Sequence, residues 1–241
     1  MWRACLNKPG KPRNGPDRNA ALAQYRRRAD FYDRELALFE PVRHKAISRL
    51  ALEHGDVVLD VGCGTGLSLE LVRQGIGAKG RIIGIDQSPE MIEKARERVA
   101  QDHRSHVTLL CSPVETADIP GLADAALFHF THDILRRPEA LANVIRHLKP
   151  GARVVASGLK WARGWGLPAN LLVLPAALHS VTSLEGLRKP WSRLAACAGP
   201  LDVETMLFGG VYIASGRFDS RTNRFSRRAL PRGGDKRHTA R

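Results

Sequence analysis

Short apolar runs alternate with segments of mixed polarity along the middle of this 241-residue chain. Runs of four to seven mostly apolar residues stand at 57–61, 81–86, 106–111, 124–130 and 152–155. Between them, apolar residues recur three and four positions apart, as on one face of a helix. Short buried strands that alternate with helices are typical of a parallel α/β sheet. The pattern therefore predicts an α/β fold.

A different pattern follows the last of these runs. Val203–Phe208 and Val211–Ser215 are two short apolar runs separated only by Gly209 and Gly210. A two-residue glycine linker between such runs predicts a β-hairpin. Because a hairpin joins antiparallel strands, we expect one antiparallel strand at the edge of an otherwise parallel sheet.

The first apolar run, 57–61, ends in a turn rich in glycine. Asp60 stands at its end, and three alternating glycines follow, Gly62, Gly64 and Gly66. Glycine allows tight turns and lets a ligand approach the backbone without a Cβ in the way. A short helical pattern then runs to Gly75, so the turn links a strand to a helix. This context predicts a nucleotide-binding turn, although a tight turn without a ligand remains the alternative.

The charge of the turn distinguishes between two kinds of nucleotide. Dinucleotide-binding proteins use the spacing G-x-G-x-x-G and place a pyrophosphate at the start of the helix. Here an acid, Asp60, leads the glycines, and it would repel a pyrophosphate but attract a cationic amino group. The sequence therefore disfavours an NAD-dependent oxidoreductase.

A second acid stands twenty residues after the turn. Asp86 ends the run 81–86, and a carboxylate at the tip of the neighbouring parallel strand can accept both hydroxyl groups of a ribose. Ser88 and Pro89 follow as the expected N-cap and first residue of a helix. Asp86 is therefore the candidate ribose ligand.

The acid-led glycine turn and Asp86 together resemble the class I S-adenosylmethionine-dependent methyltransferases, and the likeness is continuous over 56–158. The resemblance implies a Rossmann-like, doubly wound sheet of seven strands, mostly parallel with one antiparallel edge strand. It also implies that S-adenosyl-L-methionine is the cofactor and lies at the carboxyl ends of the strands. In one respect the chain departs from the family, because Pro113 stands where many members have an acid that binds adenine. The residues that the resemblance assigns to the cofactor are Tyr32, Asp60, Gly62, Cys63, Gly64, Thr65, Gly66, Asp86, Gln87, Met91, Val114, Glu115 and Phe128.

Two of these assignments have a structural alternative. The segment 29–34 resembles the Y-D motif of quinone and phospholipid methyltransferases, in which Tyr32 would lean on the sulfonium by a cation–π contact. Tyr32 could equally pack a helix onto the sheet. Met91 would lie beside the adenine or else serve only as a core residue.

Methyl transfer needs an aligned acceptor, and an oxygen or carbon acceptor also needs a base. The best candidates follow the fourth apolar run: His129 or His132 could take a proton, and Asp133 could orient one of them. A purely structural role for these histidines is the alternative. The absence of an Asn/Asp-Pro-Pro-Tyr motif argues against a methylase of nucleic-acid bases. No metal site is expected.

The segment 160–199 lies between the fifth run and the hairpin and is expected to face the substrate. Trp161, Trp165 and Trp191 stand there among Leu and Val, with Asn170 and His179. An apolar, aromatic segment beside a cofactor suits a small apolar or amphipathic acceptor. It could also form only its own small core.

The net charge of +14 lies entirely in the two ends of the chain. Residues 1–28 carry +7 and residues 217–241 carry +7, whereas 29–216 hold 21 basic and 21 acidic residues. Both ends are poor in apolar residues, so we expect two disordered basic tails flanking a methyltransferase domain at 29–216. The tails could contact RNA or acidic lipid, which keeps open an RNA-directed methyltransferase or a non-catalytic S-adenosylmethionine- or RNA-binding protein.

The four cysteines form no C-x-x-C pair, which fits a reducing, cytoplasmic setting. The N-terminus lacks an apolar core of signal-peptide length. The longest apolar stretch, 167–178, is short and is broken by Pro168 and Pro175. No transmembrane segment is therefore expected.

Overall fold

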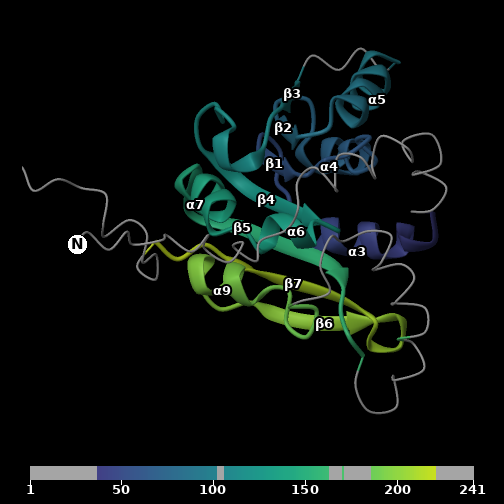
Figure 1. Ribbon diagram of the computed structural model, residues 1–241. Coiled ribbons are helices and arrows are strands. Elements are labelled where there is room, and N and C mark those ends of the chain that lie inside the picture. The colour runs from purple at the N-terminus through teal and green to yellow at the C-terminus, as the bar shows by residue number, and fades with distance from the viewer. Residues whose placement is uncertain (1–36, 102–105, 163–169, 171–185, 221–241) are drawn as a thin grey trace, which may run out of the picture.

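The computed structural model describes residues 37–101, 106–162, 170 and 186–220. At its centre lies one sheet of seven strands in the order β3-β2-β1-β4-β5-β7-β6 (Figure 1). The strands are β1 (Val57–Val61), β2 (Arg81–Asp86), β3 (Val107–Cys111), β4 (Ala123–His129), β5 (Leu148–Leu159), β6 (Asp202–Met206) and β7 (Val211–Arg217).

The pairing of the strands confirms the predicted fold class. Strands β1 to β5 are parallel to one another, and β7 is antiparallel to both β5 and β6. The antiparallel strand therefore lies in the hairpin at one edge of the sheet, with β6 outermost. The chain order reverses between β1 and β4, and the carboxyl ends of these two strands open toward the same crevice, where open α/β sheets bind ligands.

The turn of the hairpin is longer than predicted. Strand β6 ends at Met206, and Leu207–Gly209 form a short 3-10 turn, η4. Leu207 and Phe208 both adopt positive φ, 48° and 54°. Lys160, just after β5, donates a hydrogen bond from Nζ to the Gly209 carbonyl oxygen at 2.9 Å. The expected two-glycine linker is thus wrong in length, because two apolar residues turn together with the glycines.

Helices cover both faces of the sheet (Figure 1). One face carries α3 (Glu40–Arg49), α4 (Leu69–Ile76) and α5 (Pro89–Gln101), and the other carries α6 (His132–Leu135), α7 (Pro138–Arg146) and α9 (Ser192–Ala198). Each face has its own apolar cluster, one around Val42, Leu69 and Val72 and the other around Leu141 and Leu194. The inner strands are therefore buried on both sides, which explains their continuous apolar runs.

Two predictions about helix ends have different outcomes. Ser88 caps α5 as expected, since the Met91 N–H donates to Ser88 Oγ at 3.3 Å. Helix α4 continues past Gly75 and ends at Gly77, which has a φ of 66°. A Cβ at Gly75 would lie 2.9 Å from Leu52 Cδ1, so this glycine allows close packing within the helix instead of ending it.

Packed residues lie beyond residue 216, where the domain was predicted to end. Phe218 is buried in the core, and its N–H donates to the Ala152 carbonyl oxygen at 2.7 Å. Asp219 donates its N–H to Ala198 in the same way. The expected tail 1–28 and most of 217–241 lie outside the described residues, as does much of 160–199. Within the described ranges no helix is both long and apolar enough to cross a lipid bilayer.

Candidate functional site

The glycine turn connects β1 to α4 in a backbone conformation that only glycine adopts easily. Gly62, Gly64 and Gly66 have φ values of 75°, 55° and 82°. The Gly62 and Cys63 N–H groups both donate to the Ile85 carbonyl oxygen, at 2.7 and 3.0 Å, which fixes the turn against β2. The turn therefore presents its backbone at the carboxyl end of the sheet without side chains in the way.

Asp60 is a buried carboxylate with an unused oxygen. It is 2% exposed, and no described residue makes a hydrogen bond to its Oδ2. Burial raises the pKa of Asp60 to about 7, and the neighbouring Asp86 adds to the rise, whereas attraction to Arg43 lowers it. Because an unsatisfied buried carboxylate is costly, its presence at the turn indicates a site for a hydrogen-bond donor or a cation.

Asp86 lies at the end of the neighbouring strand, β2, and is hydrogen-bonded to the same turn. Its Oδ2 accepts the Gly64 N–H at 3.0 Å, and its Oδ1 accepts the Ser88 N–H at 2.9 Å. Burial raises the pKa of Asp86, and these donors offset part of the rise. The Gln87 N–H also bonds this carboxylate, so three of its acceptor positions are used, and the remaining one can accept a ribose hydroxyl group.

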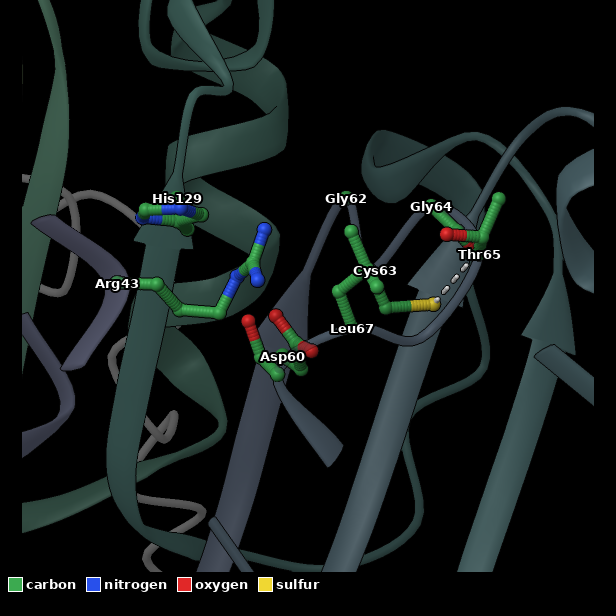
Figure 2. A pocket seen from close by; sticks show the side chains of 9 residues that line it. Arg43, Asp60, Gly62, Cys63, Gly64, Thr65, Leu67 and His129 are labelled. Atoms are coloured by element: carbon green, nitrogen blue, oxygen red, sulfur yellow. Dashed lines mark hydrogen bonds between the residues drawn. The ribbon is translucent and has the colours of Figure 1, made fainter. Parts of the chain in front are cut away.

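A pocket opens between the turn and two neighbouring elements (Figure 2). Six of the predicted site residues line it: five from β1 and the turn that follows, and His129 from the end of β4. Among the described residues, those that line it are Arg43, Asp60, Gly62, Cys63, Gly64, Thr65, Leu67, Ser68 and His129.

Arg43 is the charged residue of this pocket that the sequence reasoning missed, together with the uncharged Leu67 and Ser68. It comes from α3 and is 1% exposed, and Figure 2 shows its guanidinium reaching toward Asp60. Its Nη1 donates to Glu40, but its Nε and Nη2 find no acceptor among the described residues. The signal was present, because Arg43 shares the apolar face of α3 with Val42 and Ala46.

Of the three candidate catalytic residues, the pocket includes only His129. Its Nδ1 lies 2.7 Å from Ser157 Oγ, and its Nε2 has no partner among the described residues. Burial lowers the pKa of His129 to about 3, with a contribution from Arg43. The imidazole is therefore neutral at pH 7 and weakly basic, which disfavours the predicted proton-taking role. His132 and Asp133 belong to α6 and are not among the pocket-lining residues.

The remaining predicted cofactor residues lie either in the glycine turn, at the tip of β2 or in the protein interior. Thr65 and the glycines belong to the turn itself, and Gln87 follows Asp86 at the tip of β2. Met91 and Phe128 are 1% and 0% exposed, so both side chains are buried, and their contact with the cofactor stays a prediction.

The expected adenine contacts after β3 are already engaged with the protein. The Val114 carbonyl oxygen accepts a hydrogen bond from Asn143 Nδ2 at 2.7 Å. Glu115 pairs with Arg137 at 3.4 Å. Their contact with adenine stays a prediction. Tyr32 lies outside the described residues.

Comparison with known proteins agrees with this geometry. Residues 58–151 match the model of the methyltransferase domain family. Over 111 residues the chain is 32% identical to an arsenite methyltransferase of Halobacterium salinarum, covering 44% of the chain and 28% of the relative. Over 119 residues it is 37% identical to the ubiquinone/menaquinone biosynthesis C-methyltransferase UbiE of Geobacter sp., covering 47% of the chain and 49% of the relative. The chain thus spans about half or less of the length of these curated relatives.

A solved structure extends the likeness to the whole sheet. The N-methyltransferase NodS of Bradyrhizobium japonicum WM9, in complex with S-adenosyl-l-homocysteine, superposes with a TM-score of 0.60 at 18% identity. The match covers 83% of this chain and 98% of NodS. With the acid-led turn, the Asp86 strand end and the seven-stranded sheet in place, residues 58–151 match a methyltransferase domain, and the sheet has the fold of class I S-adenosylmethionine-dependent methyltransferases.

Proposed function

We propose that this protein binds S-adenosylmethionine and transfers its methyl group to a small apolar or amphipathic molecule. One observation carries the proposal: the buried, unpartnered Asp60 oxygen at the glycine turn, with Asp86 at the tip of the adjacent strand. A dinucleotide would place a pyrophosphate against Asp60, whereas the amino group of a methionine moiety would neutralise it.

The residues of the pocket fit the proposed cofactor. Asp60 would hold the amino group, the glycine turn would lie against the amino-acid chain, and Asp86 would accept the ribose hydroxyl groups. When bound, the cofactor supplies an electrophilic methyl group on a sulfonium centre. The protein then has to align the acceptor in line with the departing sulfur and exclude water, because positioning supplies much of the acceleration.

His129 is the candidate residue for orienting the acceptor. It stands at the carboxyl end of β4 on the wall of the pocket, and Ser157, 0% exposed, fixes its ring through Nδ1. Because a neutral imidazole offers either a donor or an acceptor at Nε2, His129 can hydrogen-bond an acceptor hydroxyl without carrying charge.

Aromatic side chains beside the pocket support an apolar acceptor. Phe130 follows His129 with a positive φ of 55°, and its ring lies 4.8 Å from those of both Phe39 and His129. A strained aromatic residue next to a ligand pocket is typical of a functional position. One relative named above is an arsenite methyltransferase and another is a C-methyltransferase of ubiquinone/menaquinone biosynthesis, and both names refer to small molecules.

Calorimetric titration with S-adenosylhomocysteine tests the cofactor. The wild type should bind, while Asp60→Ala and Gly64→Val should weaken binding at least tenfold, since a charged hydrogen bond contributes roughly 1.5–3 kcal/mol. Asp118→Ala, an exposed acid outside the pocket, is the control and should bind like the wild type. NAD should not bind. Wild-type affinity in both pocket variants would overturn the cofactor site.

The acceptor can be found by its change in mass. Incubation with cell extract and S-adenosylmethionine should yield an apolar product one methyl group heavier, absent with Gly64→Val.

The second candidate, an RNA-directed enzyme, is favoured by the +7 charge of each end of the chain. Methylated RNA in the same assay would favour it. If RNA binds only through the ends, its affinity should fall steeply with salt, because the contacts are to phosphate.

A further inference from the structure

Ser157 carries a hydroxyl group into an apolar part of the core. It is 0% exposed, and its register partners are His129 on β4 and Ile213 on β7. Side chains alternate along a strand, so Val155 and Leu159 share its face of β5. Both belong, with Ile213, to the apolar cluster on the face of the sheet that carries α3. A buried hydroxyl group in these surroundings needs a protein partner.

The imidazole of His129 is that partner. Ser157 Oγ lies 2.7 Å from His129 Nδ1, and this is the one hydrogen bond that the hydroxyl group makes with a described residue. The two residues stand opposite each other in the parallel register of β4 and β5. At the same point the Phe130 N–H donates to the Ser157 carbonyl oxygen at 2.8 Å. The sheet itself therefore fixes the contact.

The proton of this hydrogen bond can be placed in two ways. If Ser157 donates to Nδ1, the hydroxyl proton is used and the ring carries its own proton on Nε2. If Nδ1 donates to Oγ instead, the hydroxyl proton stays buried without an acceptor among the described residues, which is unfavourable. The first arrangement uses both polar groups of the contact. It should therefore be populated on the order of tenfold more than the second.

Arg43 does not reverse this choice. Its guanidinium would favour a lone pair at Nε2, but it makes no hydrogen bond to the ring, and Figure 2 shows it reaching toward Asp60. Nε2 has no partner among the described residues, so none of them fixes its state. The ring is neutral at pH 7, because burial and Arg43 lower the pKa of His129 to about 3. The hydrogen bond at Nδ1 then decides which nitrogen carries the proton.

We propose that Ser157 is a positioning residue that holds His129 in the tautomer with its proton on Nε2, so that the pocket wall offers a neutral hydrogen-bond donor. This deepens the proposed function and rests on it, because His129 is there the residue that orients the methyl acceptor. A donor at Nε2 binds a lone pair of an acceptor oxygen, but it cannot take a proton. The site then suits an acceptor that presents a carbonyl or an already deprotonated oxygen to His129.

NMR of the ligand-free full chain with nitrogen-15-labelled histidine measures the tautomer, because protonated and unprotonated ring nitrogens resonate far apart. The chain has nine histidines, so the signal that is missing from His129→Gln assigns the residue. In the wild type at pH 7, Nε2 should carry the proton in about 90% of molecules or more. Ser157→Ala removes the donor, and the population with the proton on Nδ1 should rise at least about threefold. Ser157→Thr keeps the hydroxyl group and should keep the wild-type tautomer.

Val155→Ala is the matched control, because it removes apolar volume from the same face of β5 and no hydroxyl group. It should lower the melting temperature while His129 keeps its tautomer. A wild-type His129 with its proton on Nδ1, or an unchanged tautomer ratio in Ser157→Ala, would overturn the inference. Neither result involves the cofactor, so failure of the wild type to bind S-adenosylhomocysteine would overturn the proposed function separately. If Ser157→Thr does not fold, the wild-type spectrum and Ser157→Ala still decide.

Discussion

Asp60→Asn should stabilise the ligand-free protein at pH 8 while damaging its function. Asp60 is 2% exposed, and its pKa rises from 3.8 to about 7 on folding, mainly through burial. The folded chain therefore keeps a proton that the unfolded chain loses above about pH 4. Because the folded state binds more protons, the free energy of unfolding falls as pH rises from about 4 to about 7, and stays lowered above that.

The size of the effect follows from the shift. At 1.36 kcal/mol per pKa unit, the rise corresponds to an upper limit of about 4 kcal/mol at pH 8. The pKa of about 7 already includes the attraction between Asp60 and Arg43, which offsets part of the cost of burying the carboxylate and which the variant loses. Asparagine has the same shape without the charge. In a domain of this size a gain of about 2–4 kcal/mol raises the melting temperature by roughly 5–15 °C.

Thermal unfolding at pH 5 and at pH 8, without ligand, measures the difference in stability between Asp60→Asn and the wild type. The difference between Asp60→Asn and the wild type should grow from pH 5 to pH 8, and titrations common to both proteins cancel in it. Asp118→Asn, an exposed acid, should show no such growth. A difference that does not depend on pH, or a variant less stable than the wild type at pH 8, would refute the reasoning.

Three further predictions concern the turn and the end of the domain. In thermal unfolding, Gly62→Ala should lower the free energy of unfolding by about 1–3 kcal/mol more than Gly151→Ala. A Cβ at Gly62 would lie 2.5 Å from Thr131 Cγ2, whereas a Cβ at Gly151 would meet open space. Equal losses in the two variants would contradict this. Asp86→Asn should weaken S-adenosylhomocysteine binding less than Asp86→Ala in calorimetry, and unchanged affinity in both would separate Asp86 from the ribose. A chain that ends at residue 216 should have a free energy of unfolding at least about 2 kcal/mol lower than one that ends at 220, since it loses the buried Phe218. Equal free energies of unfolding would support residue 216 as the end of the domain.

The sheet could be predicted because its inner strands are buried on both faces. That burial makes each strand a short apolar run, and the acid-led glycine turn then fixes the position of the first one. The hairpin turn could not be predicted in detail. Leu207 and Phe208 are apolar, so they read as strand, but they adopt positive φ and belong to the turn.

The site was predicted only where one local motif specifies it. Asp60, the glycines and Asp86 stand in or next to the turn, and the pairing of β1 with β2 brings them together. Arg43 comes from a helix seventeen residues upstream, and only the packing of α3 against the sheet brings it to Asp60. His129 was found because it ends a strand, but its low pKa depends on burial, which the sequence alone does not show.

A crystal structure of the chain with S-adenosylhomocysteine tests the central claim most directly. The account predicts that the amino group lies within hydrogen-bond distance of Asp60 Oδ2 and that the ribose hydroxyl groups reach Asp86. A ligand bound away from the glycine turn, or bound there with its amino-acid end directed away from Asp60, would contradict it.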